Sequence, residues 1–409
     1  MGARRVAITG IGVVSPLGNN LPDFHRALAE GRSGIRRLPE EVTRGSGVQV
    51  GATVQWSPAP LLKDGEAANL DRVSQFALGS AAQALAASRL DLAATDRNRV
   101  GVSWGTGMGG ALSVDSSYQQ VYGKGEWRVR PLTVVMAMNN AAGSNVAVRH
   151  GLRGPFANYS TACSSSAMAL GEAMRTILAG RADAMVAGGA EALLTPGTLA
   201  AWQALRTLAP ADGTDPTTSC KPFDKRRAGL VLGEGAAAFV LEDEAHARKR
   251  GATVHGYLTG YGNSCDAAHM SRPDRDGQVR AMREALEEAG LGPADIAYIN
   301  AHGTATAVGD VVEAEAINAV FDGSPVRVSS TKALHGHLLG GAGALEFAVA
   351  MLALEEGLLA PTAFLEQPDP ACKLNHVALK AERIDPPRAV MSNSFAFGGS
   401  NVVLVAQRA

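Results

Sequence analysis

Short apolar runs alternate along this chain with longer segments whose apolar residues recur at helical spacing. The short runs predict β-strands, because a strand buried on both faces is apolar at nearly every position. The longer segments predict helices with a buried face. The expected strands cover residues 5–14, 100–104, 184–187, 297–300 and 402–405, and the expected helices cover 71–90, 165–178, 278–289 and 343–356. This alternation predicts an α/β fold around a mostly parallel sheet that is covered on both faces.

Two segments far apart in the chain share a pattern. Residues 156–163 and residues 326–331 are each an expected strand that delivers polar groups to the start of an Ala-rich helix. Each segment is followed by a further strand and by a Gly-Gly pair, Gly188-Gly189 in one case and Gly398-Gly399 in the other. Self-similarity of this kind indicates an internal duplication. The sequence therefore predicts two similar α/β halves.

A boundary between the halves is expected in the charged, solvated stretch 242–250. The length of 409 residues agrees with more than one unit, since a domain typically takes ~150 residues. The predicted halves are residues 1–247 and residues 248–409.

The composition narrows the classes of protein that this chain can belong to. Hydrophobic residues make up 46% and charged residues 19%, which excludes a disordered chain. The formal charge of -1 gives no basic excess for nucleic-acid binding, and no apolar run approaches the ~20 residues of a membrane span. Gly10, Gly12 and Pro16 interrupt the first apolar stretch, so we interpret it as a strand rather than a signal peptide and expect a cytoplasmic protein.

One of the four cysteines occupies a position that suits chemistry. Cys163, Cys220, Cys265 and Cys372 are far apart and form no CxxC pair, so neither a zinc site nor a disulfide framework is indicated. Cys163 lies between an expected strand and an expected helix, where free backbone N–H groups and the helix dipole favour a thiolate. From its position alone, Cys163 is equally well explained as an inert buried cysteine.

Two histidine segments favour the chemical interpretation of Cys163. His302 lies in Asn-Ala-His-Gly-Thr-Ala-Thr, and His337 lies in His-Gly-His-Leu-Leu-Gly-Gly. Both segments follow strand C-termini, where open α/β sheets bind their ligands. Cys163 and the two histidines therefore form a candidate constellation. Spacing alone does not choose between His337 and its neighbour His335.

At these segments the chain resembles the β-ketoacyl-acyl-carrier-protein synthases of the thiolase superfamily, above all the elongating type II enzymes. The resemblance extends from Val6 to Val405 and implies a thiolase-like duplicated αβαβα layered fold with two similar halves. It also implies that His337 is catalytic, because the elongating enzymes usually have another residue type at the position of His335. The matching segments are 161–164, 187–191, 222–235, 300–306, 329–343 and 393–401.

The resemblance implies a decarboxylative Claisen condensation of a malonyl thioester with an acyl chain held on Cys163. Loss of CO2 leaves an enolate, whose oxygen needs preorganised donors, and His302 and His337 are expected to supply them. His302 is also a candidate for assisting the loss of CO2. A second oxyanion hole is expected from the backbone N–H groups of Cys163 and Phe397. Lys332 is expected behind the histidines, paired with Glu346.

The resemblance also assigns substrate contacts and partners. Thr304 and Thr306 are expected to bind the pantetheine amides, and Met108 and Trp202 to line the acyl pocket. The partner is an acyl carrier protein, and no cofactor or metal is expected because phosphopantetheine arrives on that carrier. We expect a homodimer, with a heterodimer with a related subunit left open. The expected substrate-side positions are Thr304, Thr306, Met108, Trp202, Phe395 and Glu346, and the expected carrier-docking residues are Arg206 and Lys63.

Departures from the family pattern concern the docking surface. The segment 66–70, Glu-Ala-Ala-Asn-Leu, lacks the basic residues that the type II enzymes tend to have there. A weaker or displaced patch for the acidic carrier is therefore expected, which indicates a dedicated carrier protein.

Two further motifs are given structural interpretations. Residues 105–110 match G-x-G-x-x-G, but no second strand ending in an acidic residue follows at the spacing of a dinucleotide site. Asp310 and Glu313 are interpreted as charges that cap the start of a helix rather than as metal ligands.

Three alternatives to the elongating synthase stay open. A thiolase would need a second late cysteine, for which Cys372 is the only candidate, and it lacks a Gly-rich turn. A chain-initiating synthase would pair the cysteine with one histidine and one asparagine. A non-catalytic subunit like the chain-length factors would lack Cys163. The interpretation as an elongating synthase is compatible with fatty-acid synthesis and with a related polyketide or polyene pathway.

Overall fold

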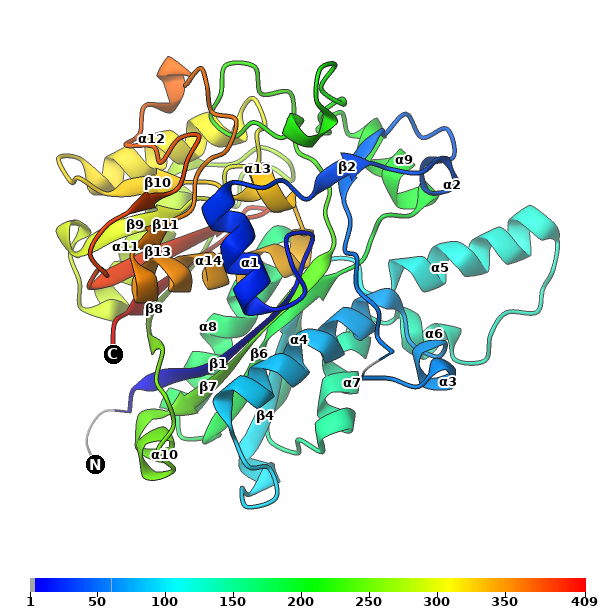
Figure 1. The fold of residues 1–409 in the computed structure, drawn as a ribbon, viewed down its shortest axis with the longest axis horizontal. Helices are drawn as coiled ribbons and strands as arrows, with labels where there is room; N and C mark the ends of the chain where they lie inside the picture. The colour runs from blue at the N-terminus through cyan, green and yellow to red at the C-terminus, as the bar shows by residue number, and fades with distance from the viewer. Residues whose placement is uncertain (1–3, 60) are drawn as a thin grey trace.

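The computed structural model describes residues 4–59 and 61–409, and a ten-stranded mixed sheet lies at its centre (Figure 1). The sheet forms because its strands are apolar on both faces and are covered by helices. From one edge to the other the strands are β10 (Arg327–Ser329), β9 (Ile296–Asn300), β13 (Ala389–Phe395), β14 (Ser400–Gln407), β8 (Gly256–Cys265), β1 (Val6–Val14), β7 (Gly235–Asp243), β6 (Ala184–Glu191), β4 (Val100–Gly105) and β5 (Phe156–Tyr159).

The sheet consists of two five-stranded parts with the same topology. Counted from the middle of the sheet, β1–β7–β6–β4–β5 in one part correspond to β8–β14–β13–β9–β10 in the other. In both parts the first two pairings are antiparallel and the last two are parallel. The parts join through a short antiparallel pairing of β1 with β8. This correspondence agrees with the predicted duplication. The predicted boundary after residue 247 lies inside α10 (Glu244–Lys249) and stays a prediction.

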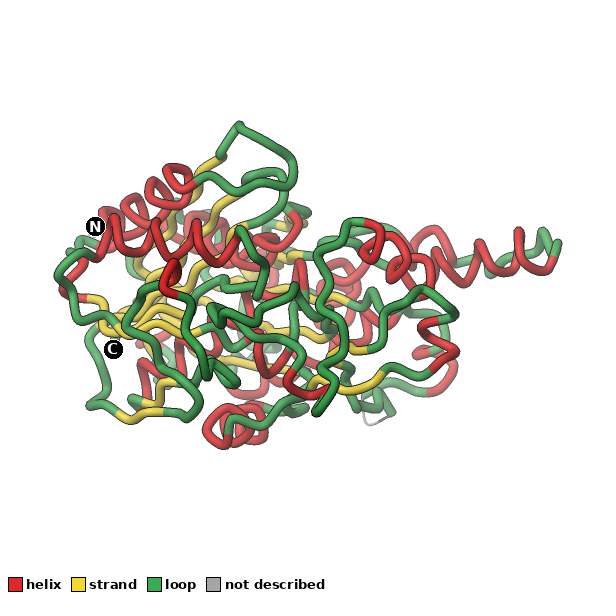
Figure 2. The backbone as a smooth tube through the Cα atoms, turned by 90° about the horizontal axis from the view of Figure 1, so that it is seen from above, coloured by secondary structure: helices red, strands yellow, loops and turns green. Residues whose placement is uncertain are grey.

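Helices form three layers around the two parts of the sheet (Figure 2). The middle layer contains α8 (Ser165–Leu178) and α14 (Ala342–Glu356), which contact each other and strands of both parts. Helix α14 is apolar around nearly its whole circumference, as a helix enclosed on all sides must be. The outer layers are α4 (Arg72–Ser88) with α7 (Ala141–His150) on the N-terminal part and α11 (Arg275–Ala289) with α12 (Gly309–Phe321) on the C-terminal part. The expected α/β layered fold is confirmed.

Two details of the expected fold are wrong. The sheet is mixed rather than mostly parallel, since five of its nine strand pairings are antiparallel. The two Gly-Gly pairs are not equivalent either. Gly188 and Gly189 lie inside β6, whereas Gly398 and Gly399 form the turn between β13 and β14. The duplication therefore rests on strand order and direction.

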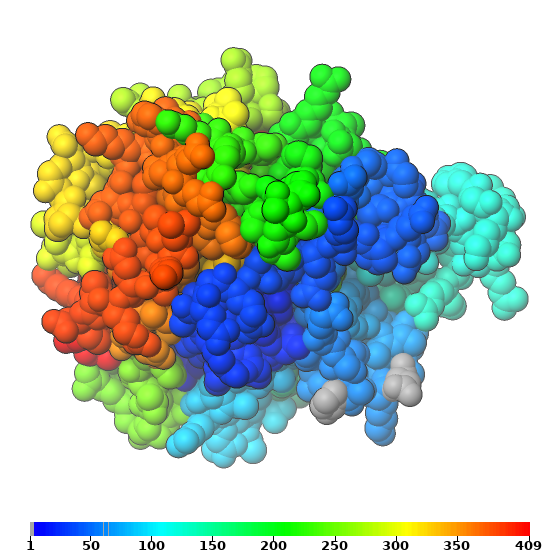
Figure 3. Space-filling model, turned by 45° about the horizontal axis from the view of Figure 1, so that its top comes forward, coloured from blue at the N-terminus to red at the C-terminus, as the bar shows by residue number. Residues whose placement is uncertain are grey.

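A segment after β4 projects from the body of the molecule. It contains α5 (Ala111–Tyr118), a returning loop and α6 (Thr133–Ala137), and it protrudes at one end in Figures 1 and 3. Its side chains include Tyr118, Tyr122 and Trp127, which are 61%, 75% and 79% exposed. Exposed aromatic residues in such number are typical of a surface that another protein covers.

The remaining elements connect these layers. Among the described residues, no helix is both long enough and apolar enough to cross a membrane. The connecting elements are α1 (Leu21–Glu30), β2 (Ile35–Arg37), α2 (Glu40–Thr43), β3 (Val50–Ala52), α3 (Asp64–Ala67), α9 (Pro196–Ala204), α13 (Lys332–His335), β11 (Leu358–Leu359) and β12 (Glu382–Arg383).

Candidate active site

Cys163 lies where the chain turns sharply from β5 into α8. A single turn of 3-10 helix, Ala162–Ser164, separates the strand from the helix, and Cys163 is 5% exposed. Ala162 has a φ of +50°, a left-handed conformation that costs a non-glycine residue on the order of 1–3 kcal/mol. The strained turn directs the Cys163 side chain into a cavity at the N-terminal end of α8, as the sequence predicts.

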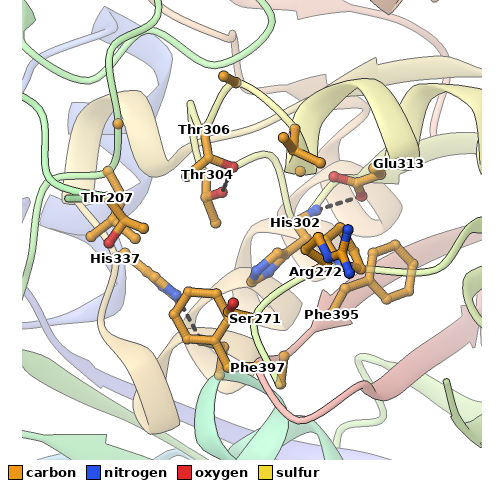
Figure 4. Close-up of a pocket in the computed structure, with 18 of the residues that line it drawn as sticks. Thr207, Ser271, Arg272, His302, Thr304, Thr306, Glu313, His337, Phe395 and Phe397 are labelled. Atoms are coloured by element: carbon orange, nitrogen blue, oxygen red, sulfur yellow. Dashed lines mark hydrogen bonds between the residues drawn. The ribbon is translucent and has the colours of Figure 1, made fainter. Parts of the chain in front are cut away.

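The structure brings His302 and His337 to Cys163 (Figure 4). The Nε2 atom of His337 lies 2.9 Å from the Sγ atom of Cys163. The two imidazole rings are 5.3 Å apart between centroids and nearly perpendicular, at 82°. One ligand-type atom from each of the three side chains lies within 4.8 Å of the others. The three side chains can therefore act on one substrate carbonyl.

His335 belongs to the structure behind the site and not to the cavity. Its Nδ1 atom lies 2.7 Å from the carbonyl oxygen of Gly336, and its Nε2 atom lies 2.9 Å from Oγ1 of Thr331. A carbonyl oxygen only accepts, so Nδ1 carries the proton and the Thr331 hydroxyl donates to Nε2. Both nitrogens are thus occupied, and the geometry favours His337 as the reacting histidine.

Lys332 fixes the protonation state of His302 from behind. Its fully buried ammonium group pairs with Glu346, donates to the carbonyl oxygen of His302 at 2.6 Å and lies 3.4 Å from His302 Nδ1. An ammonium group has only donors, so Nδ1 of His302 is the acceptor and Nε2 carries the proton. His302 therefore presents an N–H donor to the cavity.

Glu313 holds the backbone of His302 in place. Its carboxylate accepts hydrogen bonds from the N–H groups of His302 at 2.8 Å and Gly303 at 2.7 Å. Asp310 accepts from the N–H of Phe223 at 2.7 Å. Neither carboxylate caps α12, so the predicted capping role is wrong, whereas Asp310 does lie in the first turn of α12 as expected of a charge at the helix dipole. Glu313 is a positioning residue whose role the sequence analysis missed, because a carboxylate near the start of a helix was interpreted as a cap.

Burial sets the resting protonation state of the cysteine. It raises the pKa of the Cys163 thiol to about 12, although the Lys332 charge and the N–H of Phe397 both lower it. Burial, with the charge of Lys332, also lowers the pKa of His302 and of His337 well below 6.5. The resting site therefore contains a thiol beside two neutral imidazoles. This differs from the expected thiolate, because the loss of solvation outweighs the favourable helix end.

The raised pKa predicts how the free enzyme reacts with iodoacetamide. A thiol far below its pKa gains thiolate about tenfold per pH unit, and only the thiolate is alkylated. Alkylation of Cys163 should therefore accelerate from pH 7 to pH 10 without a plateau, as followed by intact mass. The exposed Cys265 provides an internal control. A plateau near neutral pH would show a preformed thiolate and contradict this assignment.

Phe397 and Trp202 lie together beside the cysteine. The N–H of Phe397 points at the Cys163 sulfur, as an oxyanion-hole donor must. The ring of Phe397 stacks on Trp202 in α9, with centroids 6.0 Å apart and planes 23° apart. Trp202 in turn packs against the apolar cluster that contains Cys163, Leu193 and Leu199. The pair forms one wall of the site.

A cavity of about 350 Å³ leads from the surface to the three reacting side chains. Thr304 and Thr306 line it, with their hydroxyl oxygens 3.1 Å apart, and so do Arg206 and Phe395. Figure 4 shows the two threonines above the histidines. The lining includes most of the predicted substrate-side positions.

Three predicted positions lie outside this cavity. Met108 is not part of its lining and is 42% exposed. Glu346 is fully buried against Lys332, so the structure does not support a direct substrate contact. Lys63 lies on the exposed surface near α3. Met108 and Lys63 are both exposed on the single protomer, and their predicted roles in the acyl pocket and in carrier docking stay predictions.

The glycine-rich loop after β4 binds an internal carboxylate. The side chain of Glu191 accepts hydrogen bonds from the N–H groups of Gly107 at 2.7 Å, Met108 at 3.1 Å and Gly340 at 3.0 Å. Backbone N–H groups that would hold a phosphate in a dinucleotide site are thus already occupied. This geometry agrees with the sequence interpretation of residues 105–110 as a structural loop rather than a dinucleotide site.

A cysteine at a strained strand-to-helix turn, facing two histidines inside a duplicated five-layer α/β fold, defines a condensing enzyme of the thiolase fold. Two family models match the chain: the β-ketoacyl synthase N-terminal domain over residues 3–247 and the β-ketoacyl synthase C-terminal domain over residues 255–366. The chain belongs to the β-ketoacyl synthase family.

Individual relatives agree with this assignment. The 3-oxoacyl-(acyl-carrier-protein) synthase 2 of Coxiella burnetii is 40% identical, over 100% of this chain and 99% of the relative. A chain of the ishigamide ketosynthase/chain length factor superposes with a TM-score of 0.93 at 32% identity, covering 100% of both chains. A chain from a complex of a type II polyketide acyl-carrier protein with its ketosynthase gives a TM-score of 0.92 at 29% identity and the same coverage.

Proposed function

We propose that this chain catalyses decarboxylative Claisen condensation of a malonyl thioester with an acyl chain carried on Cys163, giving a 3-oxoacyl thioester. The observation that carries the proposal is the convergence of Cys163, His302 and His337 at the inner end of one cavity. Each side chain has the chemistry that one step of this reaction needs. The enzyme is an acyltransferase that forms a carbon–carbon bond.

In the first step the acyl group moves from its carrier to Cys163. The thiol loses its proton as it attacks, and His337 Nε2 at 2.9 Å is placed to accept that proton. The oxyanion of the tetrahedral intermediate lies at the start of α8, where the N–H groups of Cys163 and Phe397 are donors. His337 returns the proton to the carrier sulfur, which leaves as a thiol, and His337 is neutral again.

In the second step a malonyl thioester enters the same cavity and loses CO2. The negative charge moves to the thioester oxygen, to which the Nε2–H of His302 donates. Neutral His337 donates to the same oxygen as the tautomer that carries its proton on Nε2, since its Nδ1 has no hydrogen-bond partner among the described residues. Lys332 and Glu313 keep His302 in the required orientation and tautomer. The carbanion attacks the acyl-Cys163 carbonyl, and the cysteine leaves the extended product.

The partners follow from the same chemistry. We propose an acyl carrier protein as the donor of both thioesters, with Arg206 at the cavity mouth as a docking residue. The projecting α5–α6 segment supports a dimer, with a second copy proposed as the partner and a related subunit as the alternative. A cytoplasmic location is part of the proposal.

The alternative functions are less well supported. A thiolase needs a second cysteine in the site, but Cys372 is buried and does not line the cavity. A chain-initiating enzyme would replace one histidine, whereas both are present beside Cys163. A non-catalytic subunit does not need the three groups in reacting geometry.

The direct test is a condensation assay with radiolabelled malonyl-carrier and acyl-carrier primers of several lengths. The expected result is 3-oxoacyl-carrier product together with one CO2 released for each bond formed. Release of CO2 without an extended product, with every primer, would contradict the proposal. The primer series also separates fatty-acid from specialised elongation.

Thr304 and Thr306 are predicted to bind the pantetheine arm. Replacing both with valine preserves their shape but removes two hydroxyl groups that face the cavity. The KM for carrier substrates should rise several-fold while kcat changes less, because the contact is the same in the ground and transition states. Steady-state kinetics with acyl-carrier and malonyl-carrier measure this. An unchanged KM would indicate another route for the arm.

Trp202 is predicted to limit the length of the acyl primer. Its bulky ring packs beside Cys163 and stacks on Phe397, so little free volume is left on that wall. Trp202→Phe and Trp202→Ala should shift the preference toward longer primers, in a graded way, because each methylene contributes about 1–3 kcal/mol. The measurement is kcat/KM for short, medium and long primers. Overlaid length profiles of a folded mutant and the wild type would show that Trp202 only supports Phe397 or the dimer.

A further inference from the structure

Arg272 is a cation on the cavity wall that no acidic side chain of the described residues neutralises. It lies on the loop between β8 and α11, is exposed, and lines the same cavity as Cys163. Within residues 4–59 and 61–409 its guanidinium forms no ion pair and no hydrogen bond. Figure 4 shows it on the side of His302 and Phe395, across from Thr207 and His337. An unpaired guanidinium at a cavity presents five donors to an incoming anion.

Apart from Arg206, the other arginine and the carboxylates of the cavity wall already have partners. Arg227 pairs with Asp369 at 2.6 Å. Asp266 accepts from Asn401 at 2.6 Å, and Glu313 holds the backbone of His302. Arg206, which has no ion pair among the described residues either, follows α9 on the Thr207 side of the cavity. Arg272 is therefore the uncommitted charge on the His302 side.

The loop holds Arg272 in a fixed place. The N–H of Gly398 donates to the carbonyl oxygen of Met270 at 2.8 Å, and the N–H of Asp274 donates to Asp266 at 3.0 Å. Pro273 follows Arg272 directly and restricts its backbone to extended conformations. Because the backbone is anchored on both sides of Arg272, the backbone of the loop needs little further ordering when an anion binds.

Two anionic groups enter this cavity if the proposed function holds. The first is the malonyl carboxylate, which must lie beside His302 and His337 and must leave as neutral CO2. A guanidinium paired with that carboxylate would stabilise the ground state and slow the loss of CO2. The second is the phosphodiester of the phosphopantetheine arm, which stays near solvent while the arm reaches inward. The exposure of Arg272 matches the second position.

We propose that Arg272 binds the phosphate of the phosphopantetheine arm and so selects thioesters presented on that arm. This inference rests on the proposed function, because it assumes a carrier-borne substrate. Arg272 forms charge-assisted hydrogen bonds with the phosphate oxygens, while Thr304 and Thr306 contact the amides further in. The site thereby contacts the arm at two places, the phosphate and the amides.

The kinetic test compares thioesters with and without the phosphate. Arg272→Ala should raise the KM for acyl- and malonyl-phosphopantetheine roughly tenfold and leave the KM for the corresponding pantetheine thioesters unchanged. Arg272→Glu should have a larger effect of the same kind. Arg275→Ala is the matched control, since Arg275 is exposed, pairs with Asp276 and does not line the cavity.

Binding gives a readout that does not depend on condensation. S-methyl phosphopantetheine should protect Cys163 from iodoacetamide better than S-methyl pantetheine does in the wild type, and this difference should vanish in Arg272→Ala. The methylated sulfur of both compounds keeps them from consuming the reagent. Equal protection by the two compounds in the wild type would overturn the proposal. An effect confined to malonyl substrates, with or without phosphate, would also overturn it, in favour of a carboxylate site. Protection without any condensation by the wild type would refute the proposed function and leave the phosphate site standing.

Discussion

Cys163→Ala should abolish both acyl transfer to the enzyme and carbon–carbon bond formation. Among the described residues, the sulfur is the nucleophilic atom that lies with the two histidines, and alanine has no group that can carry the acyl chain. Removing a nucleophile that forms a covalent intermediate typically costs several orders of magnitude in rate. Intact-mass analysis after incubation with an acyl-carrier primer should show the added acyl mass on the wild type and not on the mutant.

The matched control is Cys265→Ala. Cys265 lies at the end of β8, is exposed and does not line the cavity, so its loss should leave both acylation and condensation unchanged. An acyl group found on Cys163→Ala, or lost from Cys265→Ala, would place the nucleophile elsewhere.

His337→Ala should lose CO2 release while Cys163 can still be acylated. The developing enolate then has one imidazole donor instead of two, and the loss of one such donor lowers kcat by about 10²–10³. Acylation should persist but slow down, because the thiol loses the proton acceptor that lies 2.9 Å away. Single-turnover acylation and the release of labelled CO2 from malonyl-carrier measure the two steps separately.

His335→Ala separates chemistry from structure. His335 is fully buried and both of its ring nitrogens form hydrogen bonds, so its loss should lower the Tm. The rate of CO2 release by the folded protein should fall much less than in His337→Ala. A reversed pattern, with His335 essential and His337 dispensable, would mean that the wrong histidine has been assigned.

Much of the secondary structure could be predicted from the sequence, but the strand directions and the central strands β7, β8 and β13 could not. Each expected strand and helix is present. Asp71, the first residue of the expected helix 71–90, is the N-cap of α4. A strand buried on both faces shows the same apolar run whether its neighbours are parallel or antiparallel. The strands β7 and β14 are of this kind, and their antiparallel pairing made the sheet mixed.

The site was predictable where residue type and local position determine the chemistry. Cys163, His302 and His337 follow strands, and the structure brings them together. The roles of Glu191 and Glu313 were not predictable, because each carboxylate binds N–H groups from segments that only the tertiary structure brings near. The protonated state of Cys163 was missed for a similar reason. The sequence shows that Cys163 lies at a helix end, but it does not show how deeply the tertiary structure buries the thiol.

The matching topology of the two sheet parts bears on how this site arose. Cys163 follows β5, and Lys332 and His337 follow β10, which are equivalent strands of the two parts. The segments that follow these two equivalent strands therefore carry different chemistry. The segment after β5 has the nucleophile, and the segment after β10 has the groups that stabilise charge. Such a division of labour is what divergence of two fused copies produces from a symmetric ancestor.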